Sequence, residues 1–348
     1  MNLKELSRSL GLSQTTVSRA LNGYPEVAEA TRQRVMQAAA VHNYRPNARA
    51  KGLATGRTMA VGHVIPVASQ HEMVNPIFSD FIAGAGETYM RHGYDMVLSV
   101  VPDAREEAAY RELAMKGSVD GIIVHGPRAV DPRIALLQEI GLPFVVHGRA
   151  SGAQTDYNWI DVNNRRAFQR ATEFLLDLGH RRIALVNGLV SMDFAARRLR
   201  GYTDALTSRG VTPDPALIYS DEMTEAYGFG AAREVLALAQ PATAFLVSSM
   251  IAALGIRRAI EEAGLRMGRD ISVITYDDDL SYLRNGGEVP TFTATRSSVR
   301  QAGRLCADRL IDLVQNPGQP ARRHLLEAEL TVGASTGPAP AGVNRVVT

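Results

Sequence analysis

Between Thr58 and residue 278 the chain alternates short apolar runs with segments of helical periodicity, a pattern that few architectures satisfy. Strands that alternate with helices form βαβ units, which build parallel sheets with helices on both faces. Ligands of such sheets bind beyond the carboxyl ends of the strands. We therefore expect an α/β body of two doubly wound parallel subdomains, with a site in the cleft between them. The predicted strands span 59–65, 95–101, 120–126 and 143–148 in the first series and 182–188, 216–220, 243–249 and 271–278 in the second.

Residues 1–46 instead predict an all-α head of three short helices. The first follows a capping-box pattern formed by Asn2 and Glu5, and Ser13 is a suitable N-cap for the second. Two helices joined by a short turn that contains glycine are typical of a helix-turn-helix motif. The expected helices span about 3–10, 14–21 and 29–41.

The second helix lies in the stretch "LSQTTVSRALNG" (12–23), which carries hydroxyls, an amide and a guanidinium but no acid. In a helix-turn-helix motif this helix enters the DNA major groove, where such groups pair with base edges or phosphates. Residues 1–57 hold nine Lys and Arg against three Glu, a charge of +6, whereas the rest of the chain carries −4. This distribution favours an anionic partner for the head, although a solvated basic surface has the same charge.

The segment 47–57 contains "NARAKGLATG", which has helical character but is short. Helices of this length are marginal in water, and Gly52 weakens this one by about 1 kcal/mol relative to alanine. We interpret the segment as a hinge that orders only in context.

The remaining sequence excludes several classes of protein. The single cysteine, Cys306, rules out an internal disulfide and is expected to be a buried structural thiol. Neither a signal-peptide pattern nor a run of 18 apolar residues is present, which predicts a cytoplasmic protein. No catalytic residue, metal site or cofactor is expected. The run "GFGAAREV" (228–235) looks like a dinucleotide fingerprint, but polar residues precede it where a strand is needed.

Several motifs, in order, resemble the LacI/GalR family of transcriptional repressors over about 1–337. In the head these are "LSQTTVSRALNG", "VAEATRQRV" and "YRPNARA". In the body they are "NPIFSDFIAGAGETYMRHGYDMVL", "VDGIIVHG", "LGHRRIALVNG", "RLRGYTDAL" and "DISVITYDD". Within the family, the chain is most similar to repressors of bacterial α-glucoside uptake operons. The alternative is a cytosolic sugar-binding protein without a DNA role, which the basic head disfavours.

The resemblance implies a sensor folded like a periplasmic sugar-binding protein, in which the chain crosses between subdomains three times. It also implies homodimers on near-palindromic operators, associated with the nucleoid through DNA and controlled by a small effector such as a mono- or disaccharide. The crossings are expected near 158–162, 288–292 and 319–323. The expected domains are 1–46 (head), 47–57 (hinge), 58–337 (sensor, with an N-subdomain of 58–160 and 291–320 and a C-subdomain of 161–290 and 321–337) and 338–348 (flexible tail).

For the head, we expect base contacts from Gln14, Thr15 and Arg19. Phosphate contacts position such a protein without reading sequence. The polar residues expected in that role are Thr16, Ser18, Asn22 and Tyr44. The resemblance adds two hinge residues that contact DNA, Asn47 and Leu53, with Leu53 as a wedge in the minor groove.

For the cleft, Arg198 in "RLRGY" and Asp277 at the end of "ISVITYD" match ligand positions of the family. A fixed guanidinium and carboxylate can clamp neighbouring sugar hydroxyls, although an interdomain salt bridge is the alternative. Phe78, Trp159 and His125 are also candidates, each with a structural role as the alternative. The further candidates are Arg149, Asn163 and Ser249.

The sequence departs from the family pattern at several positions. The third head helix begins after Ala28, where the family has a capping serine. In the cleft, the usual Asn-Asp pair, an aromatic residue and an acid are replaced by Ser249-Met250, Met223, and Gly148 followed by Arg149. These changes allow a ligand that differs from the family's familiar sugars.

Overall fold

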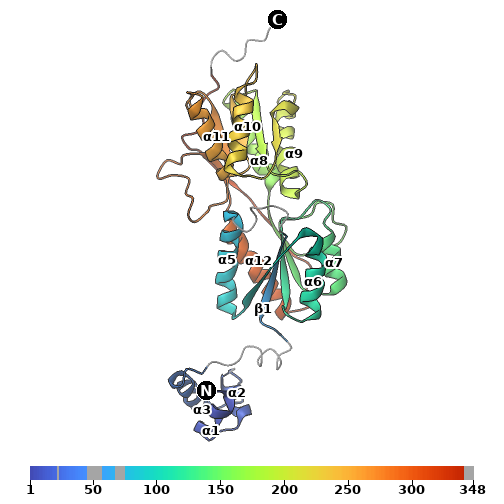
Figure 1. The fold of residues 1–348 in the computed structure, drawn as a ribbon, viewed down its shortest axis with the longest axis vertical. Helices are drawn as coiled ribbons and strands as arrows, with labels where there is room; N and C mark the ends of the chain where they lie inside the picture. The colour runs from blue at the N-terminus through green and yellow to red at the C-terminus, as the bar shows by residue number, and fades with distance from the viewer. Residues whose placement is uncertain (22, 45–56, 67–74, 341–348) are drawn as a thin grey trace.

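The computed structural model of the 348-residue chain describes residues 1–21, 23–44, 57–66 and 75–340. Figure 1 shows a cluster of three helices followed by two α/β subdomains. The predicted fold class is therefore confirmed for the described residues. Within them, no helix is both long enough and apolar enough to cross a membrane.

The head consists of α1 (Leu3–Leu10), α2 (Gln14–Leu21) and α3 (Glu29–Val41). The predicted capping box forms at the start of α1. The Glu5 amide donates to Asn2 Oδ1 at 3.0 Å, and the Asn2 amide donates to Glu5 Oε2 at 2.9 Å. At the start of α2, Ser13 Oγ accepts the Thr16 amide proton at 3.0 Å. The head core comprises Leu6, Val17, Ala20, Val27, Val35 and Ala39.

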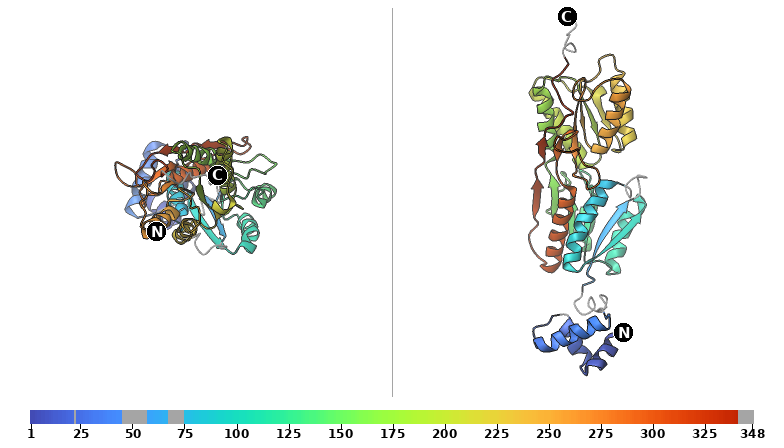
Figure 2. Two further views of the ribbon diagram at one scale, coloured as in Figure 1. Left: turned by 90° about the horizontal axis from the view of Figure 1, so that it is seen from above. Right: turned by 90° about the vertical axis from the view of Figure 1, so that its left-hand side faces the viewer.

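The first α/β subdomain, the N-subdomain, contains a six-stranded sheet whose strands pair in parallel in the order β11-β5-β4-β3-β1-β2. One face packs on α5 (Pro76–His92) and α12 (Val299–Gln315), which lie side by side in Figure 2. The other face packs on α6 (Glu106–Met115) and α7 (Pro132–Ile140), and η2 (Asp103–Arg105) precedes α6. The strands are β1 (Ala60–Pro66), β2 (Asp95–Val101), β3 (Gly121–His125), β4 (Phe144–His147), β5 (Trp159–Val162) and β11 (Arg323–Leu326).

The second α/β subdomain, the C-subdomain, has the strand order β12-β10-β9-β8-β6-β7. Its strands are parallel except β12, which runs antiparallel to β10. One face packs on α8 (Asn164–Asp177) and α9 (Asp193–Ser208), and the other on α10 (Glu225–Leu236) and α11 (Met250–Glu262). The remaining elements are β6 (Ile183–Asn187), η3 (Pro215–Leu217), β7 (Ile218–Ser220), β8 (Ala244–Val247), β9 (Ser272–Asp277), β10 (Thr293–Arg296) and β12 (Glu329–Thr331).

The chain passes between the two sheets three times, and two of these passages lie C-terminal to the expected positions. The first follows Val162, at the end of the expected 158–162. The second lies between β10 and α12, after the expected 288–292, and the third between β11 and β12, after 319–323. Residues 161–162 and 323–326 therefore belong to the N-subdomain sheet and residues 293–296 to the C-subdomain sheet, which corrects all three expected subdomain boundaries. The reason is that β10 and β11 are short runs with polar residues, and only backbone pairing identifies them as strands.

Close helix packing fixes the position of α9. An added Cβ at Gly201 would collide with the carbonyl oxygen of Arg165 on α8, so only glycine permits this approach. Cys306 is fully buried on α12, and burial raises the pKa of its thiol well above the usual value. Within the tail expected from residue 338, the Ala339 amide donates to the Leu178 carbonyl at 2.9 Å.

Candidate functional site

The exposed face of α2 carries the side chains expected at base edges. Gln14, Thr15 and Arg19 are exposed, whereas Val17 and Ala20 on the same helix are buried in the head core. No ion pair involves Arg19 within the described residues, so its guanidinium is available for an anionic partner. The face that these three side chains share is the one expected to enter the major groove.

The residues expected at phosphates have less uniform surroundings. Thr16 is partly buried, and its hydroxyl lies 2.8 Å from Ser13 Oγ. Ser18 is also partly buried. Tyr44 packs against the head core, and burial raises the pKa of its phenol. The remaining DNA-contact candidates, Asn22, Asn47 and Leu53, lie outside the described residues.

Arg32 stabilises the segment before α3, where the sequence lacks a capping side chain. Ala28 occupies the N-cap position and provides no side-chain hydrogen bond, as expected. The guanidinium of Arg32 instead donates to the carbonyl groups of Tyr24 at 2.9 Å and Val27 at 3.4 Å. Through these hydrogen bonds, a side chain of α3 fixes the segment that connects α2 to α3.

The loops that follow the parallel strands of the two sheets meet at the subdomain boundary. The Asp193 amide, after β6, donates to the Pro127 carbonyl, after β3, at 3.0 Å, and Arg128 and Met192 form an isolated β-bridge. The carboxyl ends of strands from both sheets therefore face the same boundary. This is the position expected for a ligand site in doubly wound sheets.

Buried ion pairs connect the two subdomains at this boundary. Arg197 on α9 donates through Nη1 to Asp161 Oδ2 on β5 and through Nε to Asp193 Oδ2, each at 2.6 Å. Asp161 Oδ2 also lies 3.1 Å from Arg149 Nε, and Asp193 Oδ1 accepts the Ser151 amide proton at 3.1 Å. Nη2 of Arg197 is buried and has no hydrogen-bond partner within the described part of the chain. We call Arg149, Asp161, Asp193 and Arg197 the bridging network.

On the N-subdomain side, three histidines lie close together, with His63 within β1 and His125 and His147 at the carboxyl ends of β3 and β4. His63 Nδ1 lies 2.9 Å from His125 Nε2, and the rings of His125 and His147 have centroids 6.0 Å apart. Phe78 and Phe81 on α5 pack edge-on against His125, with centroid distances of 5.2 and 4.8 Å. We call these five residues the neutral cluster.

Burial keeps the imidazoles of the neutral cluster uncharged. It lowers the pKa of His63 to about 3 and that of His147 to about 4. The pKa of His125 is also lowered well below its usual value, first by burial and then by the neighbouring imidazoles. No group of three or more His, Cys, Asp or Glu side chains in the described residues is arranged to hold a metal ion.

On the C-subdomain side, Arg198 is buried among aromatic rings. Its guanidinium carbon lies 4.0 Å from the ring centroid of Tyr276 and 4.9 Å from that of Phe194. Nε donates to Asn164 Oδ1 and Nη1 donates to the Ser248 carbonyl, both at 2.7 Å. Burial lowers the pKa of this guanidinium. Arg198 is thus a fixed cation held by neutral partners.

The two acids that follow Tyr276 differ in their surroundings. Asp277 is buried, and its Oδ1 accepts the Asp279 amide proton at 2.8 Å. The pKa of Asp278 is raised to about 7 by burial, although Arg198 acts to lower it. Arg198 is not among the groups that shift the pKa of Asp277. The carboxylate coupled to Arg198 is therefore that of Asp278 rather than Asp277. We call Arg198, Asp277 and Asp278 the charged cluster.

Three other candidates have structural partners. Trp159 is buried in the N-subdomain core on the α6–α7 face, with Arg149 stacked over its ring at 5.5 Å. Ser249 caps α11 by accepting the Ile251 amide proton at 3.2 Å. Asn163 caps α8 and donates to Glu327 Oε1 at 2.9 Å. The core position of Trp159 corresponds to the structural alternative rather than to an aromatic wall.

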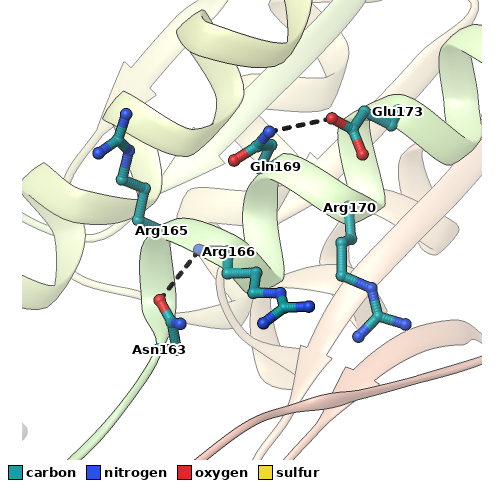
Figure 3. A pocket seen from close by; sticks show the side chains of 6 residues that line it. All are labelled: Asn163, Arg165, Arg166, Gln169, Arg170 and Glu173. Atoms are coloured by element: carbon teal, nitrogen blue, oxygen red, sulfur yellow. Dashed lines mark hydrogen bonds between the residues drawn. The ribbon is translucent and has the colours of Figure 1, made fainter. Parts of the chain in front are cut away.

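Asn163 also borders a shallow hollow along α8. Figure 3 shows the side chains that line it, and a hydrogen bond of 3.0 Å joins Gln169 Nε2 to Glu173 Oε1. The hollow follows a single helix and does not reach the neutral or the charged cluster. Its lining residues are Asn163, Arg165, Arg166, Gln169, Arg170 and Glu173.

Residues 2–47 match the model for bacterial regulatory proteins of the lacI family, and residues 172–336 match that for a periplasmic binding protein-like domain. The chain is 45% identical over 340 residues to the HTH-type transcriptional regulator AglR of Rhizobium meliloti (strain 1021), an alignment that covers 98% of this chain and 95% of AglR. The chain belongs to the LacI family. It is therefore a DNA-binding transcriptional regulator and not an enzyme.

Solved structures of LacI-family proteins have the same fold. The lac repressor dimer bound to operator and the anti-inducer ONPF is similar with a TM-score of 0.81 and 28% identity, over 97% of this chain and 99% of that one. The complex of the regulator CelR with cellobiose is similar with a TM-score of 0.71 and 28% identity, over 96% and 99% of the two chains. The glycine-rich run at 228–235 lies inside α10, so it does not follow a strand as a dinucleotide fingerprint requires.

The structure adds residues to the site that LacI-family motifs did not indicate. His63, His147, Asp161, Arg197 and Asp278 all lie in the three groups defined above. His147 ends an apolar run, so its position at the end of a strand could have been predicted from the sequence. His63 lies within such a run, and its proximity to His125 depends on the pairing of β1 with β3.

Proposed function

We propose that the chain is a cytoplasmic repressor that binds a near-palindromic operator as a homodimer and responds to a mono- or disaccharide, such as an α-glucoside. The effector binds in the cleft between the subdomains, between the neutral and the charged clusters. The observation that carries this proposal is Arg198, a buried cation near the strand ends whose hydrogen-bond partners are the neutral Asn164 side chain and Ser248 carbonyl. Aromatic faces and fixed charges suit the apolar faces and hydroxyl groups of a sugar.

The similarity to AglR supports the regulator role and the choice of effector class. The solved complex of CelR with cellobiose supports a disaccharide-sized ligand. The alternative, a sugar-binding protein without a DNA role, has no support from the head, whose α2 surface lacks acids.

Selection of binding sites from random DNA with the full-length protein tests the DNA role first. We expect the selected site to be near-palindromic, because a two-fold dimer recognises two related half-sites. Fluorescence anisotropy on that site should then show weaker binding when sucrose, maltose or trehalose occupies the sensor. Failure to select any sequence would contradict the regulator role, and no change with any of the three sugars would contradict the effector class.

Arg19→Ala tests base reading on the selected site. We expect its binding free energy to weaken by about 1–3 kcal/mol, while binding to scrambled DNA changes little, because a base contact acts only on the correct sequence. Lys116→Ala is the matched control, since it removes an exposed cation of the N-subdomain. Equal losses on both DNAs would assign Arg19 to a phosphate.

A further inference from the structure

A hydrogen-bonded chain runs from the N-subdomain core to the subdomain boundary. Tyr89 Oη on α5 lies 2.9 Å from His63 Nε2, and His63 Nδ1 lies 2.9 Å from His125 Nε2. Tyr89 and His63 are almost completely buried, whereas His125, at the end of β3, is partly exposed. Neither the family motifs nor the helix-turn-helix role accounts for this chain of three side chains.

The two imidazoles are neutral, because burial lowers the pKa of His63 to about 3 and that of His125 well below its usual value. A neutral imidazole has one N–H donor and one bare nitrogen acceptor. When two such rings share a hydrogen bond, the proton position on one fixes the proton position on the other. The hydrogen-bonded series of Tyr89, His63 and His125 therefore has only two self-consistent arrangements of its protons.

The buried hydroxyl of Tyr89 selects between these arrangements. Among the described residues, His63 Nε2 is the one acceptor within hydrogen-bond distance of Tyr89 Oη. If the hydroxyl donates to Nε2, His63 carries its proton on Nδ1 and donates to His125 Nε2. The reverse arrangement leaves a buried hydroxyl proton without an acceptor, which costs about 1–3 kcal/mol. The first arrangement is favoured, and it puts the proton of His125 on Nδ1.

We propose that Tyr89 and His63 form a tautomer relay that fixes His125 as a hydrogen-bond donor, through Nδ1, to an oxygen atom of the effector. This inference rests on the proposed function for the ligand, but the relay itself is a property of the free protein. His125 Nδ1 has no hydrogen-bond partner among the described residues, and the ring is held between Phe78 and Phe81. Tyr89 and His63 are positioning residues, since both are buried and act on a ligand only through His125.

The relay restricts the effector at this point to an acceptor, such as a sugar hydroxyl or ring oxygen. A ligand that presents only an N–H group there is rejected, because donor would meet donor. The neutral cluster thus selects a ligand by the direction of a hydrogen bond, from donor to acceptor, rather than by charge.

Long-range ¹H–¹⁵N spectra of the full-length, ¹⁵N-histidine-labelled protein test the relay without any sugar. We expect His63 and His125 both to be protonated on Nδ1. His125 protonated on Nε2 would overturn the proposal. This measurement needs no variant, so it stays decisive even if a substitution prevents folding.

Tyr89→Phe removes the hydroxyl that selects the tautomer, and both rings should then become mixtures of tautomers. The matched control is Tyr94→Phe, which deletes a buried hydroxyl without a hydrogen-bond partner from the same core. We expect the control spectrum to match that of the parent. Unchanged tautomers in Tyr89→Phe would overturn the relay.

Titration with sucrose, maltose and trehalose tests the link to the ligand. For the sugar that binds the parent, Tyr89→Phe should raise the dissociation constant about twofold, because only about half of the His125 rings then carry the proton on Nδ1, and Tyr94→Phe should leave it unchanged. An unchanged constant in Tyr89→Phe, with altered tautomers, would overturn the donor role of His125. If none of the sugars binds while the tautomers are as expected, the proposed effector class fails and the relay stands.

Discussion

The two sides of the subdomain boundary carry different kinds of side chain. The neutral cluster presents uncharged imidazoles and aromatic rings, whose hydrogen-bond directions depend on tautomers. The charged cluster presents a fixed guanidinium and two carboxylates, whose strength depends on burial and on pH. For the proposed effector, this difference predicts that the neutral cluster selects the orientation of the ligand and that the charged cluster contributes most of the binding free energy.

The bridging network joins the two sides without belonging to either. Asp161 lies on the N-subdomain sheet, whereas Arg197 lies on α9 of the C-subdomain. Because both groups are buried, the carboxylate has no solvent to replace a lost partner. The bridging network therefore adds a buried ion pair to the backbone contacts that hold the two clusters in position.

Breaking this pair should have the largest effect. Asp161→Asn leaves Arg197 and Arg149 beside a neutral amide, and loss of one partner of a buried ion pair costs about 3–5 kcal/mol. We expect this loss in the free energy of unfolding, measured by urea denaturation at pH 7. The matched control is Asp204→Asn, which breaks the half-exposed pair of Asp204 with Arg165 and should cost under about 1 kcal/mol. Similar small losses in both variants would mean that the network does not connect the subdomains energetically.

Removing the cation of the charged cluster should have the next largest effect. Arg198→Met keeps the length of the side chain but loses its charge-assisted hydrogen bonds to a sugar. We expect the dissociation constant of the sugar to rise about a hundredfold, or about 2.7 kcal/mol, by calorimetry, while operator affinity in the absence of sugar changes little. Arg200→Met, exposed on the same helix, serves as the control. Retained sugar affinity in Arg198→Met would assign Arg198 to structure alone.

The sequence predicts the strands of the alternating βα series better than the two strands at the far side of each sheet. All eight predicted strands appear, six of them because strands buried on both faces are continuous apolar runs, as in "DGIIV" and "TAFLV", whereas β2 and β7 lie at sheet edges. By contrast, β10 ("TATR") and β11 ("RHLL") are short and partly polar, so their pairing depends on contacts far along the chain. The subdomain boundaries were therefore displaced even though the fold class was correct.

In the candidate site, too, local sequence predicts some residues, whereas others depend on contacts that are distant along the chain. Arg198 and His125 could be proposed from their motifs, because each follows or ends a recognisable run. The coupling of Arg198 to Asp278 rather than Asp277 depends on how the chain turns after β9, which residue types alone do not specify. Trp159 was ambiguous because an aromatic residue next to a crossing can face either the core or the cleft. Its position is set by the pairing of β5 with β4.

The smallest effect should come from the pH response of Asp278. Its pKa of about 7 in the folded chain is higher than that of an ordinary carboxyl group, about 3.9, in the unfolded chain. The folded state therefore binds this proton more tightly, and stability is lost as pH rises from about 4 to about 7. Asp278→Asn cannot ionise, so it should match the parent at pH 4.5 and melt at a higher temperature at pH 8. The gain in the free energy of unfolding should be less than the roughly 4 kcal/mol that about three pKa units correspond to, because this residue is partly exposed to solvent.

Differential scanning calorimetry of both proteins at several pH values would measure this difference. The control is Asp177→Asn, which alters an exposed partner of Arg209 and should give the same small shift at every pH. The buried histidines of the neutral cluster also respond to pH, because the pKa values of His63 and His147, about 3 and about 4, lie below the unfolded value of about 6.5, so stability rises with pH up to about 6.5. This contribution is the same in the parent and in Asp278→Asn, so the difference between the two proteins isolates Asp278. A gap between parent and Asp278→Asn that stays constant from pH 4.5 to 8 would place the titrating group elsewhere. A gap that opens with pH would show that Asp278 itself titrates in this range, as its raised pKa implies.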